Sequence, residues 1–169
     1  MTALLCIVLT TILIIVSIVV HELGHYIICR CYKFRPIQVN FGTGRMFGKF
    51  QFNGTWFQFR TFPFGGNVII APGHLKKMGL TGSIILFLTG PGTQLIFAML
   101  ITMSGRFENS PMILESTLRT AGLIIAISSV INIIPFKKTN KDGTEFRSDG
   151  FQVRNMWRRR HQFKIVNEN

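Results

Sequence analysis

The sequence predicts an α-helical integral membrane protein with three core transmembrane helices and a small membrane-associated β-sheet between the first and the second. Apolar residues make up 47 % of the 169 residues, and they concentrate in three segments nearly free of charge, at about 3–29, 83–103 and 117–134. Each segment is about long enough to cross a bilayer as a helix. The intervening segment, 30–80, alternates aromatic and polar residues, which is typical of strands. The length predicts a single domain over residues 1–169.

The distribution of charge predicts the orientation. The formal net charge is +12, and most of it lies in segment 30–80 and in the tail, 136–169. Basic residues accumulate on the cytoplasmic side of a membrane. We therefore expect both segments to be cytoplasmic and the N-terminus to be outside, in the plasma membrane of a bacterial cell. The same basic segments are expected to contact anionic lipid. Nucleic-acid binding is disfavoured, because the charge forms no stripe of basic and aromatic residues on a soluble domain.

The first apolar segment ends in the motif His21-Glu22-Leu23-Gly24-His25. Helix residues four apart lie one above the other, so His21 and His25 can share one zinc ion. Glu22 is then placed to accept a proton from a water at that zinc. The alternative is that these residues only mark the cytoplasmic end of an anchor helix. The functional interpretation is favoured because ionisable groups are costly in an apolar helix, and because Ser17 extends the same face.

The segment between the first two spans contains a clear hairpin signal. Asn53-Gly54 separates two short stretches of alternating aromatic and polar residues, 50–52 and 55–60. We expect another turn at 41–45, and we expect the Pro- and Gly-containing stretch 62–68 to break the sheet and lead back to the bilayer. Two interpretations of the aromatic face stay open: it is the buried face of a small sheet, or it contacts the membrane interface.

The second and third spans each carry a feature unusual for a simple membrane anchor. Gly90-Pro91-Gly92 interrupts the second span, which lipid tolerates only where neighbouring groups or a cavity satisfy the freed backbone groups. The third span ends at Pro135, and Asn132 near its inner end lies at about the same depth as His21. Asn132 is therefore either a polar helix end or part of a site shared with the histidines.

A catalytic zinc takes three protein ligands, so a third must come from the cytoplasmic side. Asp149 is favoured, because it precedes Gly150 and a predicted helix start, and a short return of the chain from Pro135 can bring it to the helix ends. Asp142 stays open as the alternative, although it is also explained as a turn residue beside a glycine.

Two other features of the cytoplasmic segments bear on the site. His74 is a formal ligand candidate, but it lies in a Pro/Gly loop and is disfavoured. Residues 138–144 predict a tight hairpin turn. Residues 151–164 predict a basic amphipathic helix that lies on the inner leaflet.

Together these residues resemble the site-2 protease family of intramembrane zinc metalloproteases, as a small three-span member. The resemblance rests on four motifs in the family's order: His21-Glu22-Leu23-Gly24-His25, Pro63-Phe64-Gly65-Gly66, Gly90-Pro91, and Asn132-Ile133-Ile134-Pro135 followed by Asp149-Gly150. The resemblance implies that the histidines and the Asp of the Asp-Gly pair bind zinc, and that Glu22 activates water. It also implies that the β-segment holds the substrate in extended form.

The chain departs from the family pattern at two positions. Asp149 is farther from Pro135 than is usual, and Asp142 is closer to the usual spacing. Gln94 stands where the family often has Asn in the helix with the Gly-Pro motif.

The expected function is that of a zinc-dependent metalloendopeptidase, with Zn²⁺ as cofactor, Glu22 as the catalytic base and Asn132 positioning the substrate backbone. It would hydrolyse peptide bonds of membrane-embedded or signal-peptide-like protein substrates near the cytoplasmic side. The expected partners are such a substrate and anionic lipid, without nucleic acid. The alternative function is that of a catalytically inactive scaffold, immunity or sensor protein of the same fold, which the long spacing before Asp149 favours.

Overall fold

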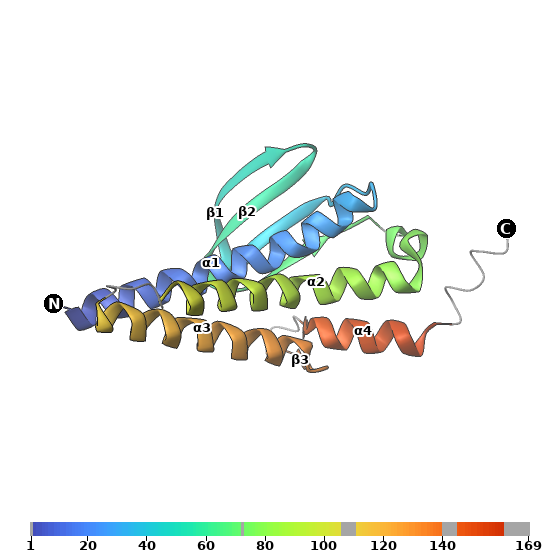
Figure 1. Cartoon of the computed structure of the whole chain (residues 1–169). Coiled ribbons are helices and arrows are strands. Elements are labelled where there is room, and N and C mark those ends of the chain that lie inside the picture. Colours follow the sequence, from blue (N-terminus) through green and yellow to red (C-terminus); the bar gives the residue numbers. More distant parts are fainter. Residues whose placement is uncertain (1, 72, 106–110, 140–144, 161–169) are drawn as a thin grey trace.

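A computed structural model describes residues 2–71, 73–105, 111–139 and 145–160. In chain order the elements are α1 (Thr2–Cys31), β1 (Gln38–Phe52), β2 (Thr55–Ile69), α2 (His74–Ser104), α3 (Met112–Ile133), β3 (Lys137–Thr139), β4 (Glu145–Arg147) and α4 (Asp149–Arg158). The predicted class is confirmed in its coarse form, since the protein is mostly helical and has a small two-stranded sheet between its first two helices (Figure 1).

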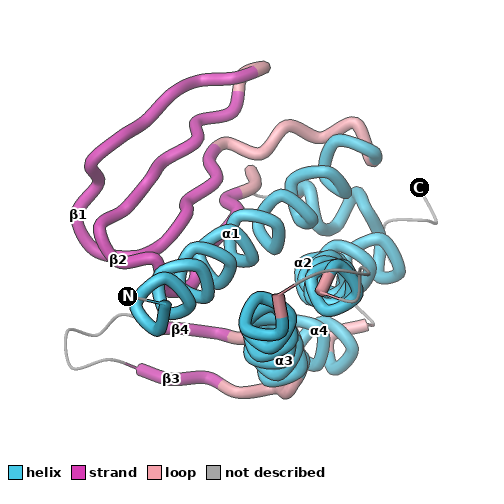
Figure 2. Tube along the Cα trace, turned by 60° about the vertical axis from the view of Figure 1, so that its left-hand side comes forward, coloured by secondary structure: helices cyan, strands magenta, loops and turns pink. Residues whose placement is uncertain are grey.

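Three helices, α1, α2 and α3, are long and apolar enough to cross a membrane. They lie side by side and alternate in direction (Figures 1 and 2). Their outward-facing side chains, such as Leu4, Ile96 and Leu123, are more than half exposed, as is typical of surfaces that lipid covers. Helical structure begins at His74, before the predicted start near residue 83, and Gly79 (φ 71°, ψ 178°) has non-helical geometry, so that α2 consists of two helical stretches joined at a kink.

Small residues set the close approach of the three helices. A Cβ at Gly24 of α1 would lie 2.5 Å from Thr93 Oγ1 of α2. A Cβ at Gly122 of α3 would lie 3.0 Å from the carbonyl oxygen of Ala98, also on α2. Glycine at such contacts lets helix backbones pack closely. The middle helix α2 is therefore in contact with both α1 and α3.

The predicted hairpin turn at Asn53-Gly54 is confirmed. Asn53 and Gly54 have φ values of 49° and 78°, and Phe52 pairs with Thr55 across the turn. Positive φ at both central residues matches the right-handed twist of the flanking strands.

The predicted break at 62–68 is wrong. β2 continues to Ile69, and its last residues lie beside the first residues of β1, so that Gly66 pairs with Phe41. Since Phe41 also pairs with Phe59, the start of β1 lies between two parts of β2. The Pro and Gly residues in this stretch are therefore accommodated within a strand that bends.

The expected turn at 41–45 is found as a bend inside β1. Gly42 and Gly44 have φ values of 88° and 83°, and the pairing register shifts on either side of them. Glycine at positive φ bends a strand as readily as it ends one, which is why the pattern looked like a turn.

The β1–β2 sheet lies beside α1 (Figure 2). Val39, Phe41 and Phe57 are buried and pack against Leu23 and Tyr26 of α1. The aromatic residues near the hairpin tip, in contrast, are exposed, with Phe47 at 73 %. The predicted aromatic face is thus buried at one end of the sheet and exposed at the other.

The C-terminal elements follow the end of α3 and pack beside α2 and α3. The helix predicted at 151–164 is found in part as α4, which contacts α2 and α3, whereas residues 161–164 lie outside the described residues and its contact with the inner leaflet stays a prediction. β3 and β4 pair antiparallel, with Thr139 opposite Glu145. We call β3, β4 and the residues between them (137–147) the insertion hairpin. Its predicted turn, including Asp142, lies outside the described residues.

Candidate metal centre

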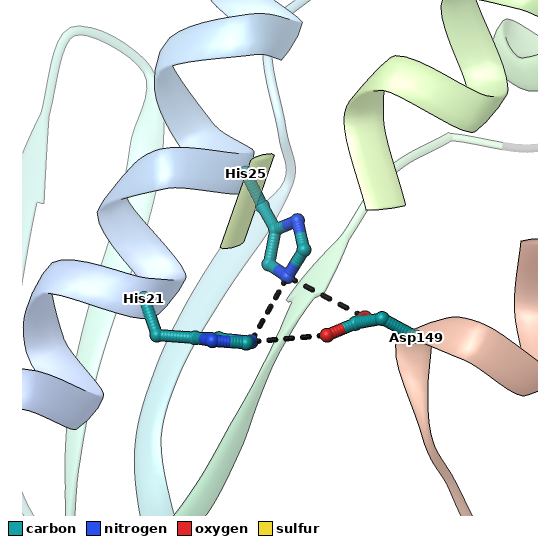
Figure 3. Close-up of side chains that lie close together, drawn as sticks. All are labelled: His21, His25 and Asp149. Carbon is teal, nitrogen blue, oxygen red and sulfur yellow. Dashed lines mark hydrogen bonds and ion pairs between the residues drawn. The ribbon is translucent and has the colours of Figure 1, made fainter. Parts of the chain in front are cut away.

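The two histidines of the motif face inward from α1 and meet at their ring nitrogens. His21 and His25 are 7 % and 6 % exposed, and their Nε2 atoms lie 3.2 Å apart. The spacing of four residues places both on one face of the helix. Figure 3 shows both rings directed to the same point, where they meet Asp149 from α4.

The other nitrogen of each ring is held by α2. His25 Nδ1 lies 2.7 Å from the carbonyl oxygen of Leu86, and His21 Nδ1 lies 3.2 Å from Gln94 Oε1. Between these two partners, Gly90 makes room for the rings, since a Cβ there would lie 2.3 Å from His25 Nε2. The Gly-Pro motif of the second span is therefore the place where α2 approaches the histidines.

Asp149 supplies the third group. Its Oδ2 lies 3.1 Å from His21 Nε2, and its Oδ1 lies 3.5 Å from His25 Nε2 (Figure 3). Burial favours the neutral carboxyl, but hydrogen bonds and charges from the two histidines outweigh it and hold the pKa of Asp149 below its usual value. Asp149 is therefore ionised at neutral pH and is a ready anionic ligand. We call His21, His25 and Asp149 the ligand triad.

The insertion hairpin explains how a distant Asp149 reaches the histidines. Ser148 N donates to the carbonyl oxygen of Phe136 (3.1 Å), and Phe136 N donates to Ser148 Oγ (3.0 Å). The chain therefore leaves and returns at the same place. Ser148 Oγ also donates to the carbonyl oxygen of Ile134 (2.7 Å) and accepts from Phe151 N (3.1 Å), which caps α4.

Gly150 allows α4 to begin against the end of α3. A Cβ at this position would lie 1.7 Å from the carbonyl oxygen of Ile133, which is backbone and cannot move aside. The glycine after Asp149 is therefore required for the contact that brings the carboxylate to the site.

Asn132 contacts the ligand triad directly. Its Nδ2 donates to Asp149 Oδ2 (2.9 Å) and lies 3.3 Å from His21 Nε2. Asn132 and His21, which were expected at about the same depth, are thus in contact. In this arrangement Asn132 orients the carboxylate, and its role toward a substrate stays a prediction.

Glu22 lies in the same cavity as the triad and is 3 % exposed. Its Oε2 has no hydrogen-bond partner among the described residues. A Cβ at Gly66 of β2 would lie 2.5 Å from Glu22 Oε1, so this glycine leaves room for the carboxylate. A buried carboxylate oxygen without a partner is free to interact with a ligand in the cavity.

The cavity has a volume of about 500 Å³ and is bounded by several elements. One wall is formed by apolar residues of α1 and α3, including Ile18 and Ile131. Its other wall is formed by β2, around Gly65, and by the insertion hairpin, including Phe146. The ligand triad and Glu22 thus lie in a cavity that α1, α3, β2 and the insertion hairpin bound together.

The donor set fits a divalent metal ion. The ligand atoms of His21, His25 and Asp149 all lie within 4.8 Å of one another. Carbonyl oxygens only accept hydrogen bonds, so His25 carries a proton on Nδ1, and the neutral ring then has its Nε2 lone pair available for a metal ion. Two imidazole nitrogens and a carboxylate that converge with one position left for water are typical of catalytic zinc.

Among the other candidates, His74 is not part of this cluster. Its ring stacks on Phe34 at a centroid distance of 4.5 Å. Asp142 lies outside the described residues. Of the candidates that the structure describes, Asp149 is the one found at the histidines.

The sequence interpretation did not assign roles to Gln94, Gly66 and Ser148. Gln94 was noted only as a departure from the family pattern. The available signal was its position as a polar residue in an apolar helix, four residues after Gly90 and so on the same face. Gly66 belongs to the Pro63-Phe64-Gly65-Gly66 motif, and Ser148 precedes the predicted helix start as a typical N-cap residue, but their contacts at the site join segments distant in the chain.

The family model described as Peptidase family M50 matches residues 9–158 and therefore includes every residue of the site. The search of curated proteins finds no match.

Proposed function

The chain belongs to peptidase family M50, the site-2 protease family, and on this basis we propose that it is an intramembrane zinc metalloprotease. Its substrates would be membrane-embedded or signal-peptide-like proteins, cut near the cytoplasmic side. The observation that carries the proposal is the ligand triad, with Glu22 beside it, in a cavity lined by three helices apolar enough to span a membrane.

His21, His25 and Asp149 would hold the zinc ion, which supplies Lewis-acid chemistry toward water and the scissile carbonyl when bound. Glu22 acts as general base: its carboxylate accepts a proton from the attacking water and then delivers it to the leaving nitrogen. Asn132 holds Asp149 through its amide. The buried position of these groups strengthens their electrostatic interactions.

The substrate would bind in extended form along β2. The segment from Phe64 to Val68 lines the cavity, and its residues pair with the start of β1 on one side. An extended peptide can add to an exposed strand edge through backbone hydrogen bonds. A transmembrane helix hides its carbonyls, so this mode of binding would present them to the site only after the helix unwinds.

Basic residues at the start of α2 and the end of α4 support a membrane orientation. Lys76 and Lys77 lie in the first turn of α2, and Arg158, Arg159 and Arg160 lie at the end of α4. We propose that this end faces the cytoplasm and contacts anionic lipid, with the N-terminus outside. The exposed aromatic tip of the β1–β2 hairpin would lie at the same interface.

The inactive-scaffold alternative rested on the long spacing between Pro135 and Asp149. The insertion hairpin accounts for that spacing, because Ser148 returns to Phe136 and leaves Asp149 at the histidines. The spacing therefore no longer favours an inactive protein.

Glu22→Gln tests the proposal. We expect hydrolysis of a candidate membrane substrate to fall by about 10²–10⁴-fold, because the base is removed while the ligand triad is intact. Zinc content, measured on the same purified protein, should not change. Glu115→Gln is the matched control, since Glu115 pairs with Arg119 at the opposite end of the bundle. Cleavage by the Glu22 variant at the wild-type rate would show that the base is wrongly assigned.

A further inference from the structure

A chain of buried hydrogen bonds connects His21 to the backbone of α1 through α2. His21 Nδ1 lies 3.2 Å from Gln94 Oε1, and Gln94 Nε2 donates to Ser17 Oγ at 3.3 Å. Ser17 Oγ in turn donates to the carbonyl oxygen of Ile14 at 2.7 Å. Gln94 is 4 % exposed and Ser17 is 1 % exposed, so water does not compete for these bonds.

The donor and acceptor in each of these hydrogen bonds are determined by the last acceptor, the carbonyl oxygen of Ile14. The Ile14 carbonyl can only accept, so the Ser17 hydroxyl must donate to it and has only lone pairs left for Gln94. Gln94 must then turn its NH₂ group toward Ser17 and its carbonyl oxygen toward His21. His21 must therefore carry a proton on Nδ1, and the neutral ring then has its Nε2 lone pair available for a metal ion.

From this we propose that Gln94 is a positioning residue for His21, which holds the ring in its metal-binding tautomer and so increases the affinity of the site for zinc. The inference rests on the zinc site of the proposed function and assigns to α2 a part in it. Partners of the second ring nitrogen orient metal-bound histidines and increase their basicity.

The two histidines differ in the group that accepts the hydrogen bond from Nδ1. His25 is held by the Leu86 carbonyl, which is backbone and is kept in every variant. His21 is held by a side chain that a substitution can remove. The dependence on Gln94 is therefore specific to one of the two rings.

The test compares Gln94→Leu with Gln94→Glu in the purified full-length chain in detergent. Zinc affinity is measured by competition with a chromophoric chelator, and ligand geometry by the visible absorption of the cobalt-substituted protein. We expect Gln94→Leu to weaken zinc binding by roughly 10–100-fold and to alter the cobalt spectrum. Gln94→Glu should retain the affinity, because its carboxylate still accepts from His21 Nδ1.

If Gln94 acted only through packing, the leucine variant would bind zinc more tightly than the glutamate variant. Leucine fills nearly the same space as glutamine, whereas glutamate would bury an additional charge and harm the fold more. If the leucine variant binds zinc as well as the wild type, or better than the glutamate variant, the inference is wrong.

Ser17→Ala provides a second, independent comparison. It should weaken zinc binding less than Gln94→Leu does. In the double variant Ser17→Ala/Gln94→Leu, zinc binding should be no weaker than in Gln94→Leu alone, because Ser17 acts through Gln94. Ser129→Ala is the matched control: Ser129 is also fully buried and donates to a carbonyl of α2, that of Pro91, but contacts no ligand. Additive effects of the Ser17 and Gln94 changes would overturn the inference.

The wild-type measurement separates this inference from the function on which it rests. If the wild-type chain binds no zinc, both are wrong. If it binds zinc and Gln94→Leu binds it equally well, the proposed function stands and only the role of Gln94 is refuted.

Discussion

The ligand triad is assembled from two regions that differ in how they reach the site. His21 and His25 are brought together by one helix, since four residues of α1 place both rings on one face. Asp149 arrives through the insertion hairpin and a capping serine, more than a hundred residues later in the chain. The comparison shows that local periodicity suffices for two ligands, whereas the third depends on closing a loop.

The largest expected effect on zinc binding is for substitution of a histidine on α1. His25→Ala should abolish stoichiometric zinc binding, because a single histidine and a carboxylate are a much weaker donor set. Metal analysis of the purified protein checks this. One zinc per chain in both the wild type and the variant would contradict the assignment of the site.

At the distant ligand, Gly150→Ala should displace Asp149 without changing any ligand. The added Cβ would lie 1.7 Å from the Ile133 carbonyl oxygen, so α4 has to shift. We expect a loss of stability of about 1–3 kcal/mol, measured by thermal unfolding, together with weaker zinc binding. Wild-type values for both would mean that the approach of α4 to α3 is not needed for the site.

A smaller effect is expected for Ser148→Ala, which removes the N-cap of α4 and the bonds to Ile134 and Phe136. Loss of such a cap costs about 0.5–2 kcal/mol. Because Ser148 precedes Asp149, zinc affinity should fall as well, which separates this change from a simple loss of stability. Unchanged zinc affinity would show that the hairpin closes without this serine.

The smallest effect is expected on the outside of the insertion hairpin. Glu145 pairs with Lys137 and Arg147, and these cations lower the pKa of its exposed carboxyl. Exposed ion pairs contribute little, so Glu145→Gln should leave zinc affinity and thermal stability unchanged. A clear loss of zinc affinity would show that the hairpin is held closed by its surface charges.

The sequence by itself determined the features that repeat over short distances. Three apolar segments, the His21–His25 pair and the Asn53-Gly54 turn were all predicted and are all observed, because helix periodicity and turn geometry depend on neighbouring residues. Membership of the family was likewise evident from the motifs in their order along the chain.

The tertiary structure decided the features that depend on contacts between distant segments. It brought Asp149 to the histidines, folded the end of β2 back beside the start of β1, and placed Gln94 against His21. The Pro and Gly residues at 62–68 illustrate the reason: the same residues permit a strand end or a bend, and only the partner strand selects between them. The physical difference is that loop closure and long-range pairing depend on the packing of the whole chain, which local sequence patterns do not contain.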